Sequence, residues 1–293
     1  MDLKKQLEIH LHQIARERDT YLATAGHFFV QEYIRASFSQ WGSVEIHTFK
    51  VNNKLYENLI LNLPSDFKTG KSYLSPNLSP ILIAAHYDSV PGSPGADDNA
   101  SGVAVLLELA RIFATEPTKY PIRLVAFDME EAGLLGSQEY VNQLLEDKQK
   151  LRLMLSLEML GYCNLNPGTQ EYPAPILKKF YPDTGDFIAL IGNLKTVPDL
   201  MRLRNSFRKS GTKSEFLPVP NNGKIVPAVR RSDHAPFWDA GYKAMMVTDT
   251  SFLRNPHYHK SSDKIETLDL DFLTGVCLGL EKGIRGLGGR SNK

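Results

Sequence analysis

The chain has 293 residues, 42% of them hydrophobic and 23% charged, which is ordinary for a globular protein with a sizeable buried core. Its formal net charge of +1 gives no global field that would attract nucleic acid or an anionic membrane, so neither is expected as a partner. The two cysteines, Cys163 and Cys277, lie far apart in the sequence. This excludes a disulfide scaffold and a thiolate zinc finger, and it fits a reducing compartment.

The N-terminus is charged throughout and lacks the apolar core of a signal peptide. No apolar run approaches the length of a transmembrane helix. We therefore expect a cytoplasmic protein, although a secreted chain trimmed of its signal would have the same sequence. The sequence leaves the oligomeric state open.

The first 80 residues predict a helix followed by an edge of a sheet. Residues 3–40 have apolar positions at helical spacing, and Gly26 marks a position where this helix could break. Two strand-like runs follow at 44–51 and 58–63, and they fit an antiparallel edge pair. Residues 64–80 are rich in proline, serine and lysine, which indicates a surface loop.

From residue 81 onward, short apolar strands alternate with helices. The expected strands span 81–86, 122–128, 151–158, 186–192 and 243–250. The expected helices span 101–114, 132–147 and 268–284, with another between the last two strands. Near-continuous apolar strands between helices indicate parallel strands that are covered on both faces. Because no repeat or linker divides the chain, we predict a single α/β domain over residues 1–293, with a central, mostly parallel mixed sheet.

Residues that can bind a metal follow each central strand. In chain order these are His86 and Asp88, Asp98, Glu130 and Glu131, Glu158, and then His257 and His259. In open α/β sheets, ligands bind beyond the carboxyl ends of the strands, so these side chains are expected at one edge. Each residue alone has an ordinary explanation as a core histidine, a helix cap or an acidic first turn.

Taken together, these carboxylates would repel one another at one edge unless cations were bound there. Imidazole and carboxylate ligands without thiolate suit zinc with an open catalytic position, and also manganese or cobalt. Other catalytic schemes have little support, because the chain contains no H-E-x-x-H, no G-x-S-x-G and no glycine-rich phosphate loop.

Five segments, in this order, resemble metallopeptidase family 28, the co-catalytic zinc aminopeptidases of the bacterial leucyl aminopeptidase type: "AAHYDSVPGSPGADDNASG", "FDMEEAGLLGSQEYV", "LEMLGY", "RSDHAPF" and "NPHYHKSSD". The resemblance runs from about residue 80 to 265 and implies the zinc exopeptidase fold, which is phosphorylase/hydrolase-like. It also implies two zinc ions. His86, Asp98 and Glu158 would hold one ion, while Asp98, Glu131 and His259 would hold the other.

The same resemblance implies roles for residues around the ions. Asp88 would orient His86, as ligating histidines usually require. Glu130 would be the general base, and Tyr258 would donate to the oxyanion. Since successive residues that leave a strand point in opposite directions, the adjacent glutamates can divide metal binding and proton transfer between them.

The turn containing Arg231 and Asp233 would border the pocket for the amino terminus of the substrate. The peptide bond between Asp98 and Asn99 would be cis. The chain departs from the family in having Glu158 where many relatives have aspartate, and in lacking their secretion signals and disulfides. We expect the longer carboxylate to tune the first metal site and not to abolish it.

The sequence thus predicts a di-zinc aminopeptidase whose substrates are peptides with a free N-terminus. The nearest enzymatic alternative is a glutaminyl cyclase of the same fold, although the compact "EEAGLLGS" is more similar to the peptidases. A non-catalytic relative, as in the transferrin-receptor branch, would lack ligands or the base. The rim segments 160–185 and 211–230 are expected to shape the specificity pocket, but the sequence does not name the preferred residue.

Overall fold

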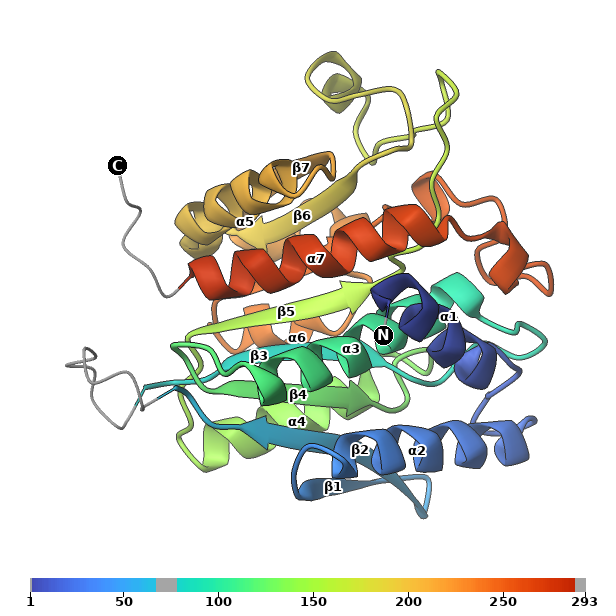
Figure 1. Ribbon diagram of the computed structural model, residues 1–293, viewed down its shortest axis with the longest axis vertical. Helices are drawn as coiled ribbons and strands as arrows, with labels where there is room; N and C mark the ends of the chain where they lie inside the picture. Colours follow the sequence, from blue (N-terminus) through green and yellow to red (C-terminus); the bar gives the residue numbers. More distant parts are fainter. Residues whose placement is uncertain (1, 67–77, 288–293) are drawn as a thin grey trace.

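Eight strands form one mixed sheet in the computed structural model, which describes residues 2–66 and 78–287 (Figure 1). Their order across the sheet is β1-β2-β4-β3-β5-β8-β6-β7. The strands are β1 Val44–Val51, β2 Lys54–Leu63, β3 Ile81–His86, β4 Ile122–Phe127, β5 Leu153–Glu158, β6 Ile188–Asn193, β7 Ser214–Val219 and β8 Ala244–Thr248. The central strands β4, β3, β5 and β8 are mutually parallel, so their carboxyl ends share one edge of the sheet.

Helices cover both faces of this sheet (Figure 1). One face packs against α1 Leu3–Ile14, α2 Thr24–Ser39, α3 Gly102–Thr115, α5 Val197–Lys209 and α7 Leu270–Gly286. The opposite face packs against α4 Leu135–Glu146 and α6 His234–Asp239. The predicted α/β architecture, with a mostly parallel mixed sheet between two helical layers, is confirmed.

The strand β3 explains why the central strands are apolar along their whole length. Ile81 and Ile83 pack in the core under α3, whereas Leu82 and Ala84 pack in the core on the opposite side. All four side chains are completely buried. Because neither side of the strand faces water, the usual alternation of apolar and polar residues is absent.

The N-terminal helix is divided at a different place from the one expected. The break spans residues 15–23, and Gly26 lies inside α2. A Cβ atom at Gly26 would lie 2.0 Å from the carbonyl oxygen of Glu17, so glycine is required here for close approach of the chain and not for a helix break.

Among the strands and α-helices of the described ranges, β7, which falls within the expected rim segment 211–230, and the short helix α6 were not predicted. The strand β2 also begins earlier than expected, at Lys54. The predicted surface loop at 64–80 falls mainly on residues 67–77, which lie outside the described residues. Within the described ranges, no helix is long and apolar enough to cross a membrane.

The contact between α5 and α7 depends on glycine. A Cβ atom at Gly279 would lie 2.2 Å from Cδ1 of Phe207, whereas at Gly286 the nearest atom, Oγ of Ser206, would lie 3.7 Å away.

We predict that Gly279→Ala lowers the free energy of unfolding by ~1–3 kcal/mol, because Phe207 must move in a packed core. Gly286→Ala, the matched control, should raise it by up to ~1 kcal/mol through helix propensity.

Urea denaturation of the two variants measures both effects. Equal stability changes in the two variants would show that the helices do not depend on this close approach.

Candidate metal centre

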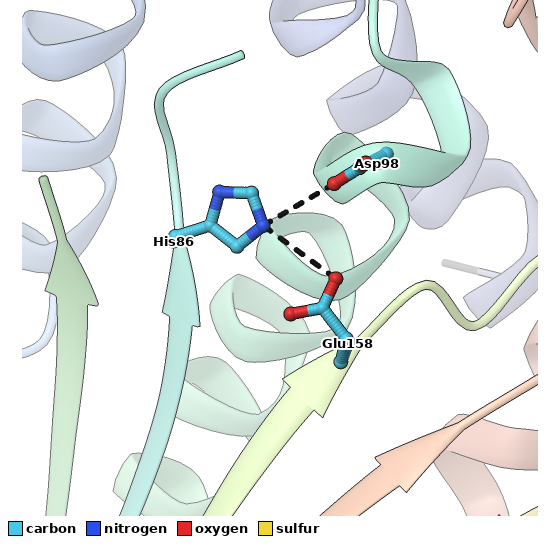
Figure 2. A group of neighbouring side chains, drawn as sticks. All are labelled: His86, Asp98 and Glu158. Atoms are coloured by element: carbon cyan, nitrogen blue, oxygen red, sulfur yellow. Dashed lines mark ion pairs between the residues drawn. The ribbon is translucent and has the colours of Figure 1, made fainter. Parts of the chain in front are cut away.

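The shared edge of β3, β4, β5 and β8 brings the predicted metal ligands together. His86 ends β3, Glu158 ends β5, and Glu131 follows β4. Asp98 lies in the kinked segment 96–101 that leads into α3, where the backbone of Asp98 and Asn99 is not helical, and the peptide bond between these two residues is cis, as the resemblance implies. Figure 2 shows the side chains of His86, Asp98 and Glu158 pointing toward one another from these three elements.

The first group of side chains is centred on His86. Its Nε2 lies 3.3 Å from Oδ1 of Asp98 and 3.6 Å from Oε1 of Glu158 (Figure 2). The other oxygen of Glu158, Oε2, accepts a hydrogen bond of 2.7 Å from the hydroxyl of Ser232. Glu158 is therefore oriented by Ser232 so that one oxygen faces the imidazole.

The second group is centred on His259, in the loop after β8. Its Nε2 lies 3.2 Å from Oδ2 of Asp98 and 3.3 Å from Oε2 of Glu131. Asp98 thus directs one carboxylate oxygen to each histidine. In each group, one ligand atom from every residue lies within 4.8 Å of those of the other two.

Unpartnered polar atoms show that these side chains suit a cation. Both ring nitrogens of His86 and Oε1 of Glu131 are buried without a hydrogen-bond partner. Buried polar atoms in proteins are normally satisfied, so such atoms gathered at one point require an explanation. A divalent ion satisfies imidazole and carboxylate atoms together, and the absence of thiolate ligands suits zinc with an open position, manganese or cobalt.

The carboxylates of the cluster are electrostatically unfavourable by themselves. Without a cation, burial raises the pKa of Glu131 to about 7 and raises the pKa of Glu130 well above its usual range. Burial also opposes ionisation of Asp98, but the neighbouring imidazoles of His259 and His86 lower the pKa of that carboxyl below its usual value. Bound cations would favour the ionised form of every carboxylate in the cluster.

Asp88 explains how two adjacent glutamates are held at the end of β4. Its two carboxylate oxygens accept hydrogen bonds of 3.1 Å from the backbone N–H groups of Glu130 and Glu131. Its Oδ1 also lies 3.4 Å from Nδ1 of His86. One buried carboxylate therefore fixes the glutamate turn and faces the imidazole of a predicted ligand.

A cavity of about 500 Å³ opens beside the cluster. Glu130, Glu131, Glu158 and Tyr258 line it where it meets the predicted ligands. Its remaining wall is mainly apolar and comes from β6, β7, β8 and the loops around them, including Tyr172, Phe187, Ile191, Phe216, Met246 and Phe252. Both expected rim segments, 160–185 and 211–230, contribute to this wall.

The three predicted residues around the pocket lie in different environments. Tyr258 stacks on the ring of His259 with 3.7 Å between ring centroids, and Arg231 lines the cavity. Asp233 is completely buried, has no hydrogen-bond partner and does not line the cavity. The role of Asp233 at the pocket stays a prediction.

The chain belongs to Peptidase family M28, whose sequence model matches residues 67–277. It is 33% identical over 260 residues to the uncharacterised protein YfbL of Escherichia coli (strain K12), covering 85% of this chain and 77% of YfbL. It is 42% identical over 130 residues to the aminopeptidase YwaD of Bacillus subtilis (strain 168), covering 41% of this chain but only 27% of YwaD. The resemblance seen in the sequence is confirmed, and the chain is a peptide-bond hydrolase.

Solved structures share the fold. The LapA aminopeptidase of Legionella pneumophila superposes with a TM-score of 0.72 at 20% identity, covering 98% of this chain and 72% of LapA. BSAP, a zinc aminopeptidase from Bacillus subtilis, gives 0.60 at 27% identity, covering 83% of this chain and 52% of BSAP. A glutaminyl cyclase of Bacteroides thetaiotaomicron gives 0.66 at 17% identity, covering 97% and 96%. Family, relatives and site together support a metal-dependent aminopeptidase.

Sequence reasoning missed the residues that hold the Asp98 loop in place. Arg18 is completely buried between α1 and α2, and its guanidinium donates to the carbonyl oxygens of Tyr87, Pro94, Gly95 and Asp98 at 2.6–3.3 Å. Arg18 lies in a polar stretch that was expected to be helical, so no sequence signal distinguished it from a surface residue.

Asp263 holds the same loop from the other side. Its carboxylate accepts hydrogen bonds from the backbone N–H groups of Asp97 and Asp98, at 2.9 and 3.1 Å. Asp263 is the last residue of the family-like segment "NPHYHKSSD", but nothing in the sequence pattern indicates its contact with the Asp98 loop. Arg18 and Asp263 together fix the backbone on both sides of the shared ligand.

We predict that Arg18→Met lowers the free energy of unfolding by at least ~3 kcal/mol, because several buried carbonyl groups lose their donor at once. Arg18→Lys should recover only part of this loss, since an ammonium cannot reproduce the planar fork of the guanidinium. Arg16→Met is the matched control. Cζ of Arg16 lies 3.9 Å from the centroid of the Phe29 ring. Loss of this contact should lower the free energy of unfolding by about 1 kcal/mol or less.

Chemical denaturation of the three variants measures these values. An Arg18→Met variant as stable as Arg16→Met would show that the loop is held by other contacts.

Proposed function

We propose that this chain is an aminopeptidase that removes the N-terminal residue of peptides and uses two zinc ions, with manganese or cobalt as alternatives. The observation that carries the proposal is the pair of ligand groups that share Asp98 and open, beside Glu130, onto an apolar cavity. His86, Asp98 and Glu158 would hold one ion, and Asp98, Glu131 and His259 the other.

Zinc bound there would supply Lewis acidity, which acidifies water and polarises the carbonyl of the scissile bond. The chain supplies the groups that position the substrate and move protons. The carboxylates at the cavity mouth attract the positively charged amino terminus of a peptide, and the apolar wall excludes water from the side chain next to it. This arrangement favours cleavage of the first peptide bond over internal bonds.

Glu130 is the best candidate for the general base. Its Oε2 lies 3.9 Å from Nε2 of His86, farther than the corresponding oxygens of Asp98 and Glu158, and its side chain lines the cavity. Because Glu130 and Glu131 also form a possible ligand group with His86, distance alone does not divide their roles. The contact of Glu131 with His259 favours Glu131 as the ligand and leaves Glu130 to accept a proton.

The proton transfers can be followed through the named groups. Glu130 accepts a proton from the attacking water as its oxygen bonds to the scissile carbonyl carbon. The same carboxyl then gives this proton to the departing amine as the carbon–nitrogen bond breaks. Tyr258 stays protonated because burial raises the pKa of its hydroxyl, so it can donate a hydrogen bond to the oxyanion that forms between these steps.

We expect chelator-treated protein to lose hydrolysis of leucyl-p-nitroanilide and to regain it on addition of zinc, manganese or cobalt. An N-acetylated substrate should remain intact, because it lacks the amine that the carboxylates attract. A panel of aminoacyl-p-nitroanilides would identify the preferred residue. Release of ammonia from glutaminyl peptides, without hydrolysis of the panel, would instead establish a glutaminyl cyclase.

A second prediction separates the two adjacent glutamates. Glu130→Gln keeps the size of the side chain but cannot accept a proton, so kcat should fall ~10²–10⁴-fold while metal content stays at the wild-type level. Glu131→Gln should lose affinity for one of the two ions, and excess zinc should restore part of its activity. Steady-state kinetics combined with metal analysis of the purified variants measures both properties.

If Glu130→Gln loses metal while Glu131→Gln keeps it, the roles are reversed. If neither substitution alters hydrolysis, the pair is only the acidic start of a turn and the mechanism is wrong.

A further inference from the structure

Among the charged side chains that line the cavity outside the predicted metal cluster, one has no ion-pair partner in the part of the chain that the structure describes. Besides the predicted metal ligands and Glu130, four charged side chains line it: Glu171, Glu215, Arg230 and Arg231. Three of these have partners. Glu171 pairs with Lys178 at 2.6 Å, Glu215 pairs with Arg204 and Arg208 at 3.1 and 2.7 Å, and Arg230 pairs with Asp239 at 2.6 Å.

Arg231 has no ion pair and no side-chain hydrogen bond to any residue that the structure describes. Its guanidinium instead lies over the ring of Phe252, with Cζ 5.0 Å from the ring centroid. An arginine stacked on an aromatic ring keeps its N–H donors free in the plane of the guanidinium. Arg231 therefore presents unused donors and an unbalanced positive charge at the cavity wall.

A series of contacts links Arg231 to the predicted metal ligands. Phe252 contacts Tyr258 with 5.8 Å between ring centroids, and Tyr258 stacks on His259 at 3.7 Å. The next residue along the chain, Ser232, donates to Glu158. Arg231 therefore lines the same cavity as both ligand groups and contacts the aromatic residues that lead to His259.

The charge of the cluster determines what Arg231 can bind. Two divalent cations carry four positive charges, which equal in number the negative charges of Asp98, Glu130, Glu131 and Glu158 when these are ionised. Glu130, which is not a proposed ligand, still lines the cavity and can attract an ammonium group. Arg231 then has no ion-pair partner among the residues that line the cavity. A guanidinium repels the ammonium group of a substrate. The guanidinium of Arg231 therefore does not suit the amino terminus, although the resemblance placed the turn of Arg231 and Asp233 beside the pocket for that group.

We propose that Arg231 binds a carboxylate of the substrate on the leaving side of the scissile bond. This inference rests on the proposed aminopeptidase function and names its substrate class: short peptides, principally di- and tripeptides, whose C-terminal carboxylate reaches Arg231. An acidic side chain at the same position offers the same chemistry. A planar guanidinium with free donors pairs with a carboxylate through two parallel hydrogen bonds, which also fixes the orientation of the peptide.

The test compares the zinc-loaded protein on leucyl-alanine with leucyl-alanine amide, and on leucyl-alanyl-alanine with its amide. The wild type should have a kcat/KM at least roughly tenfold higher for the free acids than for the amides, because only the acids pair with Arg231. Leucyl-aspartic acid amide tests whether an acidic side chain can bind Arg231 in place of the C-terminal carboxylate, because the side chain of aspartate carries the only carboxylate of this peptide.

Variants of Arg231 identify the receptor of the carboxylate. In Arg231→Met the ratio of kcat/KM for acid over amide should fall to about one, and in Arg231→Glu it should fall below one. Arg231→Lys should keep part of the preference. Arg230→Met, the matched control at a neighbouring cavity residue already paired with Asp239, should keep the wild-type ratio.

Three outcomes decide the inference. Hydrolysis of acids and amides at equal kcat/KM by the wild type overturns the role of Arg231 while the aminopeptidase function stands. A wild-type ratio retained in Arg231→Met also overturns it. Failure of the metal-loaded wild type to hydrolyse any of the peptides overturns the proposed function, and the substrate class falls with it.

Discussion

The site depends on one carboxylate, Asp98, whose two oxygens face two different histidines. Oδ1 lies 3.3 Å from Nε2 of His86 and Oδ2 lies 3.2 Å from Nε2 of His259. The two halves of the cluster can share a ligand only if this side chain is held between them. Arg18 and Asp263 provide that restraint, because the first binds carbonyl groups of the loop and the second binds its N–H groups.

The parallel strands bring the side chains of this cluster to one edge of the sheet. Because β4, β3, β5 and β8 run in the same direction, every predicted metal ligand is carried by a strand end or by the loop after it. Asp88 then aligns the turn of Glu130 and Glu131 with His86. Helices cover both faces of the sheet, and the cavity wall beside the cluster is formed by β6, β7, β8 and the loops around them.

The sequence was sufficient for the features that short apolar strands determine. Such strands predicted the parallel sheet, and the polar residues directly after them, such as His86 and Glu158, predicted the ligand cluster. Arg18 could not be predicted, because its importance comes from carbonyl groups about 70–80 positions away. Likewise, β7 has only partly buried side chains over most of its length, so it lacks the apolar pattern that revealed the central strands.

The central claim is that two cations share Asp98. Anomalous diffraction from crystals of the zinc-loaded protein, recorded on both sides of the zinc absorption edge, tests it most directly. The account predicts two peaks, one bounded by His86, Asp98 and Glu158 and the other by Asp98, Glu131 and His259. A single peak bound by only one of these groups at saturating zinc, or peaks away from Asp98, would contradict it.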